Sequence, residues 1–86
     1  MTLQLLRRRI DRIDSQLLRL LNQRASLAIR VGRLKQRRGA RLFDPIRERA
    51  ILRRLAEANG GPLSREAVRA LYREILRQTR RVEQSV

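Results

Sequence analysis

The chain has 86 residues and a formal net charge of +14, and it contains neither Cys nor His. A chain this short forms one domain with a marginal core of its own. The missing Cys excludes a disulfide framework and a thiol nucleophile, and the missing His removes the usual general base and the commonest transition-metal ligand. No apolar run approaches the ~18 residues of a membrane span, so we expect a cytoplasmic protein that contacts no membrane.

The stretch 3–38 carries an uninterrupted helical pattern. Apolar side chains recur in steps of three and four, which places them on one stripe of a helix. No Pro interrupts this stripe, and Thr2 is suited to cap its start. Such a helix would run about 50 Å at ~1.5 Å per residue, which is too long for a small domain unless something lies along it. The positions of the stripe are Leu6, Ile10, Ile13, Leu17, Leu20, Arg24, Leu27, Val31 and Leu34.

Two basic residues of this helix stand out from the others. Arg24 occupies the middle of the apolar stripe, where a buried guanidinium requires an anionic partner, either a carboxylate of the chain or a ligand. Lys35 is the only lysine, because the other 21 of the 22 basic residues are Arg. Most of the remaining Arg residues are expected to form a solvated face.

A second helix is predicted over 45–58. Asp44 as N-cap, followed by Pro45 at the first helical position, is a strong helix-start signal. One stripe of this helix joins two acids to apolar positions, so the acids are expected to continue its buried face. The positions of that stripe are Asp44, Glu48, Ile51, Leu55 and Ala58.

A third helix is predicted over 65–84. The Asn-Gly-Gly-Pro run at 59–62 ends the second helix, and Ser64 caps the third. We therefore predict an all-α fold, with one long N-terminal helix and two shorter ones in a single domain, 1–86. The stripe of the third helix consists of Val68, Tyr72, Ile75, Thr79, Val82 and Val86.

Several polar residues fall on or beside these apolar stripes. Taken singly, each is most often an ion pair or a snorkelling side chain at the edge of a core. Together they predict an Arg- and Lys-rich pocket that binds carboxylates and stabilises developing negative charge. Such a pocket has no metal cage and no activated nucleophile, so it suits reactions in which the substrate makes its own bonds. The residues are Arg7, Arg24, Lys35, Asp44, Arg47, Glu48, Thr79 and Glu83.

The order of these residues resembles a known family, the all-helical class of chorismate mutases. The chain carries L-x-x-x-R-x-x-I-D-x-I-D, then L-L-x-L-L-x-x-R, then V-G-x-L-K and D-P-x-R-E, and the resemblance covers about 3–83. No single motif is decisive, but together they are specific. The residues that carry it are Leu3, Arg7, Ile10, Asp11, Ile13, Asp14, Leu17, Leu18, Leu20, Leu21, Arg24, Val31, Gly32, Lys35, Asp44, Pro45, Arg47 and Glu48.

This resemblance implies an intertwined homodimer in which the long helices of both subunits line two active sites. It also implies the Claisen rearrangement of chorismate to prephenate, in phenylalanine and tyrosine biosynthesis, with no cofactor and no metal. Arg24 and Arg47 then look like ligands of the substrate carboxylates, with Thr79 helping, and Arg7 would reach into the partner subunit's site. Thr79 stands where Ser is usual in the family, and the hydroxyl is kept.

The resemblance places four further residues around the reacting part of the substrate. Lys35 would donate to the ether oxygen, Glu83 would face that oxygen from the opposite side, and Asp44 and Glu48 would hold the substrate hydroxyl. A compact ammonium directs one charge at one oxygen, which explains a single Lys among so many Arg. Glu83 stands where many members carry Gln, which leaves the working pH open.

Alternatives stay open at this point. The same fold supports isochorismate-pyruvate lyases and mutases of 4-amino-4-deoxychorismate. A basic nucleic-acid-binding module would use the +14 charge, although the Arg residues are spread over all three helices and stacking aromatics are scarce, which argues against a specific nucleic-acid partner. A coiled-coil dimerisation module would use the stripe but leaves Arg24 unexplained. The sequence also leaves open whether the chain stands alone or is fused to another pathway enzyme.

Overall fold

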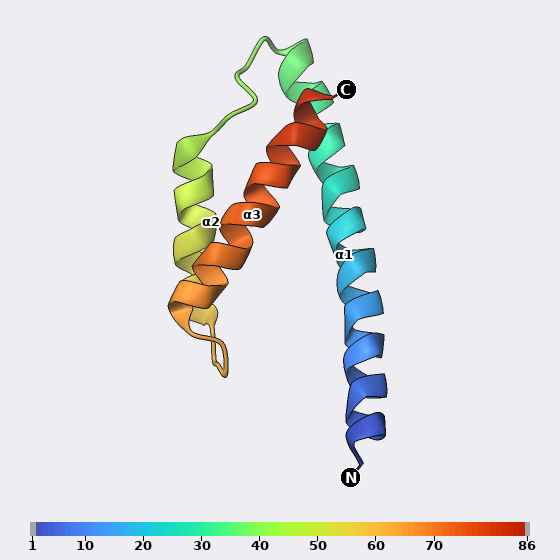
Figure 1. Cartoon of the computed structure of the whole chain (residues 1–86). Coiled ribbons are helices and arrows are strands. Elements are labelled where there is room, and N and C mark those ends of the chain that lie inside the picture. Colours follow the sequence, from blue (N-terminus) through green and yellow to red (C-terminus); the bar gives the residue numbers. More distant parts are fainter. Residues whose placement is uncertain (1, 86) are drawn as a thin grey trace.

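The computed structural model describes residues 2–85, which form three helices and no strand (Figure 1). α1 spans Leu3–Arg37, α2 spans Pro45–Ala58 and α3 spans Arg65–Gln84. The predicted all-α architecture is confirmed. α1 ends one residue before the predicted bound, and the bounds of α2 and α3 coincide with those expected.

Each helix begins at a residue whose side-chain oxygen accepts a hydrogen bond from the backbone N–H three residues later. α1 is followed by Gly39, whose φ of +66° lies in the left-handed region that Gly adopts at little cost. The chain can therefore turn back from α1 toward α2. The residues that cap the N-termini of the three helices are Thr2, Asp44 and Ser64, with donor–acceptor distances of 3.1, 3.0 and 3.0 Å.

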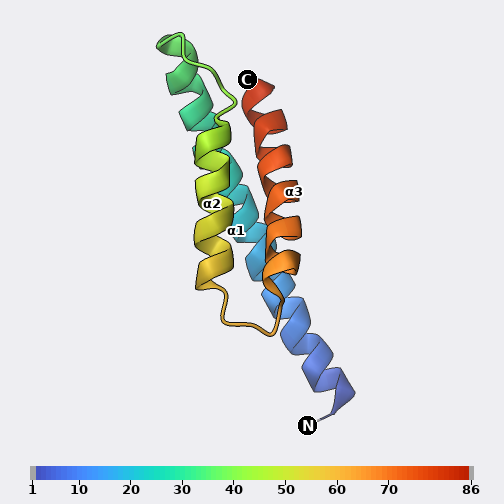
Figure 2. The same cartoon turned by 90° about the vertical axis from the view of Figure 1, so that its left-hand side faces the viewer.

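α3 packs against both of the other helices, whereas the backbones of α1 and α2 do not approach each other closely along their described lengths. The chain is elongated, with principal extents of 55 × 25 × 15 Å and a radius of gyration of 15.9 Å. A compact domain of this length would have a radius of gyration of about 12 Å. In Figure 2 the N-terminal end of α1 projects well beyond α2 and α3.

The core that one chain forms is small. Among the described residues its buried apolar members are Ile51, Ala56, Val68 and Leu76. On α1 the residues that are at least half-buried include one position of the apolar stripe, Arg24, and otherwise lie beside the stripe, where Ala and Gly side chains let α3 approach closely. These residues are Arg24, Ala25, Ala28, Ile29, Gly32 and Lys35.

The α1 stripe itself is left exposed. Its aliphatic side chains, at the positions given above, are between 42 and 57 % exposed, and every residue from 2 to 23 is exposed. Such a row of aliphatic side chains is far larger than the scattered apolar residues of an ordinary surface. Within residues 2–85, no other helix therefore covers the apolar side chains in the N-terminal half of α1.

The expected buried stripe of α2 is correct only in part. Glu48, Ile51 and Leu55 are buried or half-buried, but Asp44 and Ala58, at the two ends of the stripe, are exposed. Among the described residues no helix is both long and apolar enough to cross a membrane.

Candidate active site

A cavity of about 250 Å³ opens between the three helices and the 38–44 connection. Its apolar walls come from side chains such as Leu27, Val31 and Ile51. Seven of the eight predicted site residues line it, and the eighth, Arg7, does not. We call this cavity the polar pocket. Its polar and charged lining residues are Arg24, Lys35, Asp44, Arg47, Glu48, Thr79, Arg80 and Glu83.

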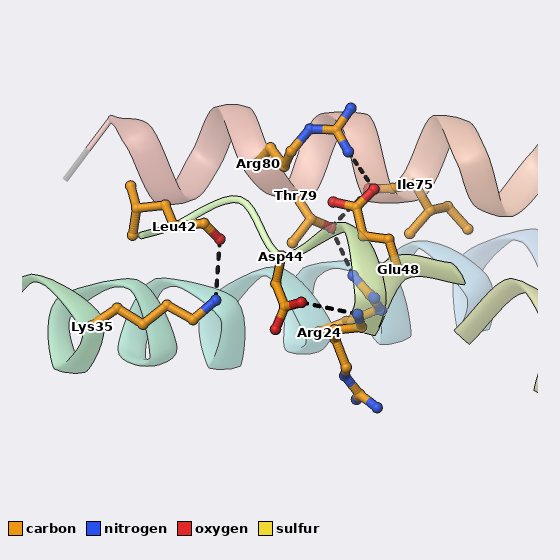
Figure 3. A network of polar contacts seen from close by, with 9 residues as sticks. Arg24, Lys35, Leu42, Asp44, Glu48, Ile75, Thr79 and Arg80 are labelled. Carbon is orange, nitrogen blue, oxygen red and sulfur yellow. Dashed lines mark hydrogen bonds and ion pairs between the residues drawn. The ribbon is translucent and has the colours of Figure 1, made fainter. Parts of the chain in front are cut away.

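Arg24 reaches across the pocket from α1 to α3. Its Nη1 donates to the Thr79 hydroxyl oxygen at 2.6 Å, and that hydroxyl donates to the Ile75 carbonyl at 2.7 Å (Figure 3). The Thr79 proton is thus committed to the backbone, and its oxygen holds the guanidinium in place. The sequence suggested a carboxylate as the partner of Arg24 within the chain, whereas the structure pairs Arg24 with a hydroxyl. The Arg24 guanidinium has five N–H donors, so after this contact it retains donors for an anionic ligand.

Lys35 lies in the last turn of α1 and is half-buried. Its Nζ donates to the Leu42 carbonyl at 3.1 Å, which ties the 38–44 connection to α1. An ammonium carries three donors, so this contact leaves donors for a ligand. The arrangement presents a compact positive charge at the wall of the pocket.

The start of α2 brings acidic and basic groups together. Asp44 Oδ1 accepts from the Arg47 backbone N–H at 3.0 Å, which leaves the second carboxylate oxygen and the Arg47 guanidinium available to a ligand. One turn further, Glu48 forms an ion pair with Arg80 of α3. The Arg80 guanidinium also stacks over the Phe43 ring, with its central carbon 4.9 Å from the ring centroid.

Glu83 is the buried carboxyl of the site. It is 8 % exposed, and its Oε2 has no hydrogen-bond partner. Its side chain lies over Gly32 of α1, where an added Cβ would stand 3.4 Å from the Glu83 Cβ. Burial raises the pKa of Glu83 above its ordinary value, and the charge of Glu48 raises it further, while Lys35 and the nearby Arg side chains oppose the rise.

Arg7 lies outside the polar pocket. It is exposed, and it precedes Arg24 by 17 residues on α1, which is about 25 Å along a helix at ~1.5 Å per residue. No side chain spans that distance, so Arg7 cannot serve the pocket of its own chain. Any contribution of Arg7 requires the site of another copy.

Sequence reasoning missed two pocket groups, Arg80 and the Leu42 carbonyl. Arg80 follows Thr79 and precedes Glu83 by three residues, so a helical projection would have placed it near both. It did not stand out because Arg is so abundant in this chain. Every residue has a backbone carbonyl, so the pattern of side chains could not predict that Lys35 would bind the Leu42 carbonyl.

The chemistry available to the polar pocket is limited by its side chains. Four cations and three acids line it, and no group of three or more acidic side chains within 2–85 is arranged to hold a metal ion. The cations can bind carboxylates, and a proton retained on Glu83 can be donated to an oxygen. Fold and site together define an all-helical protein with a cavity whose cations are suited to bind carboxylates.

The family model for chorismate mutase type II matches residues 6–84, and the chain belongs to this family. Two relatives are bifunctional chorismate mutase/prephenate dehydratases. That of Neisseria gonorrhoeae is 47 % identical over 77 residues, which is 90 % of this chain, and that of Aquifex aeolicus is 44 % identical over 75 residues, which is 83 %. The chain spans about a fifth of the length of these relatives, 21 % in each case.

Solved structures agree with this membership. A chorismate mutase of Thermus thermophilus superposes with a TM-score of 0.93 at 37 % identity, covering 94 % of this chain and 92 % of that one. A chorismate mutase of Helicobacter pylori, solved in complex with prephenate, superposes with a TM-score of 0.89 at 30 % identity, covering 96 % and 90 %. The likeness therefore extends over nearly the whole of both chains.

Proposed function

We propose that the polar pocket binds chorismate and converts it to prephenate. The observation that carries this proposal is the convergence of Arg24, Lys35 and Glu83 on one cavity in a chain of this family. The charges suit the substrate, which is a dianion. The charged lining sums to +1 with all three acids ionised and to +2 when Glu83 holds its proton.

The reaction needs no group from outside the substrate. One C–O bond breaks as one C–C bond forms within the same molecule, so no proton, electron pair or leaving group is exchanged with the protein. Catalysis then rests on holding a flexible molecule in its reactive conformation and on stabilising the charge that develops at the ether oxygen. A pocket of fixed cations without a nucleophile is suited to both.

We assign the pocket residues as follows. Arg24, oriented by Thr79, and Arg47 bind the substrate carboxylates. Asp44 and Glu48 bind its hydroxyl through carboxylate oxygens. Lys35 donates to the ether oxygen, and protonated Glu83 donates to the same oxygen. The buried, unpaired Oε2 of Glu83 supports this role, because a proton on that side chain would find its partner in the substrate.

We also propose that the functional unit is an intertwined homodimer. The exposed α1 stripe is a self-complementary surface of a kind that a two-fold symmetric pairing buries. A second, largely apolar hollow of about 290 Å³ shares Arg24 and Thr79 with the polar pocket and adds Leu21 and Ala25 of α1. A helix of the partner would close this hollow and bring its Arg7 to the substrate.

A complementation experiment tests the shared site. The Arg7→Ala and Lys35→Ala proteins, each nearly inactive, are expected to regain about a quarter of wild-type activity when mixed and refolded together. Random pairing makes half of the dimers mixed, and each mixed dimer holds one intact site because both lesions fall in the other. The measurement is the specific activity of the mixture against each variant refolded alone.

The matched control is a mixture of Arg24→Ala with Lys35→Ala. We assign both residues to the pocket of their own chain, so every site of a mixed dimer keeps one lesion and no recovery is expected. Absence of recovery in the Arg7 mixture, with subunit exchange demonstrated, would remove Arg7 from the site.

The activity itself is tested with purified protein and chorismate. We expect loss of the chorismate absorbance and appearance of prephenate, identified as the product. Isochorismate and 4-amino-4-deoxychorismate serve as competing substrates, and preferred turnover of either, or release of pyruvate, would replace the mutase assignment. Unchanged chorismate under all conditions would contradict an activity of this pocket.

The bifunctional relatives bear on whether the chain is part of a longer protein. We propose that residues 1–86 form one mutase domain, equivalent to the mutase part of the bifunctional relatives, and that prephenate dehydratase is a candidate for fusion or association. The expected cytoplasmic location stays a prediction.

A further inference from the structure

Arg80 is the charged residue of the polar pocket to which the proposed function assigns no role. It is half-buried on α3, and it contacts two different parts of the pocket wall. Its guanidinium pairs with the Glu48 carboxylate of α2 and lies 4.9 Å from the centre of the Phe43 ring. Both partners are more than 30 residues away in the sequence, so these contacts join separate segments of the fold.

We propose that Arg80 is a positioning residue, which holds the Glu48 carboxylate at the pocket wall and joins it to the Phe43 ring. This inference rests on the proposed function, because the role of Glu48 there is to bind the substrate hydroxyl. A carboxylate that must accept one particular hydroxyl benefits from losing its rotational freedom before the substrate arrives. Arg80 supplies that restraint from a third helix.

The Arg80 pair differs from the surface ion pair on the same helix. Arg77 pairs with Glu74 one turn away, and both side chains are 54 % exposed. The Arg80 and Glu48 side chains are 31 and 20 % exposed, and they come from different helices. An exposed pair within one helix contributes little, whereas a half-buried pair between helices restrains both partners and is less screened by salt.

The Phe43 contact extends the restraint to the connection between α1 and α2. Phe43 stands between Leu42, whose carbonyl accepts from Lys35, and Asp44, which caps α2. A guanidinium within ~6 Å of a ring centroid is attracted to its face. Arg80 therefore holds the segment that supplies one predicted substrate ligand and the backbone partner of another.

Arg80 also acts on the electrostatics around Glu83. The charged groups that face Glu83 are Lys35 and Arg24 of α1, Glu48 of α2 and Arg80 of α3. The positive charge of Arg80 opposes protonation of Glu83, and the charge of Glu48 favours it. Loss of Arg80 removes a cation and leaves the Glu48 charge unpaired, so both changes raise the pKa of Glu83.

The test compares Arg80→Met with Arg77→Met, the same chemical change one turn earlier on α3. We expect Arg80→Met to lower kcat/KM for chorismate by about tenfold, as for the loss of a hydrogen bond to a charged group, and to move the alkaline decline of activity to higher pH. Arg77→Met is expected to change neither. Arg80→Lys keeps the charge, so its alkaline decline is expected to lie near that of the wild type.

A double substitution separates positioning from direct binding. If Arg80 acts through Glu48, Arg80→Met has little further effect on kcat/KM in the Glu48→Gln protein, because the two effects are coupled. An undiminished effect in that background would overturn the proposal that Arg80 acts by positioning Glu48. Wild-type kcat/KM and an unmoved pH profile in Arg80→Met would overturn the inference altogether.

A measurement without substrate keeps this result distinct from the proposed function. The glutamate side-chain carboxyl carbons of ¹³C-labelled protein are titrated by NMR, with Glu48 and Glu83 assigned from their Gln variants. We expect Arg80→Met to raise the Glu83 midpoint and to shift the Glu48 signal, and Arg77→Met to do neither. Unchanged signals would overturn the inference, whether or not the wild type converts chorismate.

Discussion

Replacing Lys35 by Ala is expected to lower kcat/KM for chorismate by about a thousandfold, the loss typical of removing one preorganised donor at a developing oxyanion. The ammonium is the only compact cation of the polar pocket, and the substrate ether oxygen gains negative charge as its C–O bond breaks. The fold should tolerate the change, because the Lys35 side chain donates to the Leu42 carbonyl, while the backbone hydrogen bonds of Lys35 are kept by Ala. Steady-state kinetics and circular dichroism measure the two properties separately.

Arg24→Ala is expected to cause a comparable loss, with a marked rise in KM, because the proposed bidentate contact with a substrate carboxylate would disappear. The Thr79 hydroxyl loses its donor in this variant, but it keeps its own bond to the Ile75 carbonyl. Arg30→Ala is the matched control, since Arg30 is an exposed residue of the same helix and its loss should leave kcat/KM unchanged. Near wild-type kcat/KM in either the Lys35 or the Arg24 variant would show that the residue is not part of the site.

Turnover is expected to decline from mildly acidic toward alkaline pH as Glu83 loses its proton. An ionised carboxylate would repel the ether oxygen, whereas a protonated one donates a hydrogen bond to it. Burial raises the pKa of Glu83, and the bound dianion raises it further by offsetting the charges of Lys35 and Arg24. The protonated, active form therefore dominates below the raised pKa and is lost as the pH passes through it.

Glu83→Gln is expected to flatten this profile and to keep activity at high pH, because an amide donor does not titrate there. The measurement is kcat/KM from about pH 5 to 9 at fixed ionic strength for both proteins. Glu74→Gln is the control: hydrogen bonds from Arg77 and Gln78 lower the pKa of Glu74 to about 2, so it carries no proton in this range. A flat wild-type profile, or a Gln variant inactive throughout, would show that Glu83 is not the donor.

The helices could be predicted from local chemistry. Asp44-Pro45 starts α2, the Gly-rich run at 59–62 ends it, and Gly39 lies just beyond α1, because caps and breakers act over a few residues. The convergence of seven polar residues on one cavity also followed from the pattern, because a charged residue on an apolar stripe is costly unless it has a partner or a ligand.

The pairing of these side chains could not be predicted in the same way. Arg24 bonds to Thr79 and Glu48 pairs with Arg80, and both pairs depend on how the connections orient three helices. The sequence also did not indicate which row of α1 would pack against α3. α3 packs beside the α1 stripe, along the row that contains Ala28 and Gly32, because small side chains allow a close approach that Leu would prevent.

In the proposed homodimer, the exposed apolar stripe of α1 would make activity depend on protein concentration. A helix that finds its apolar partner only in a second copy makes folding and assembly one bimolecular event, so thermal midpoints rise with protein concentration. Dilution of the proposed dimer would then lower activity without any inhibitor, since each pocket would lose the partner helix that closes it and, with that helix, Arg7. The rate of synthesis of the chain would in this way set the activity per molecule as well as the number of molecules.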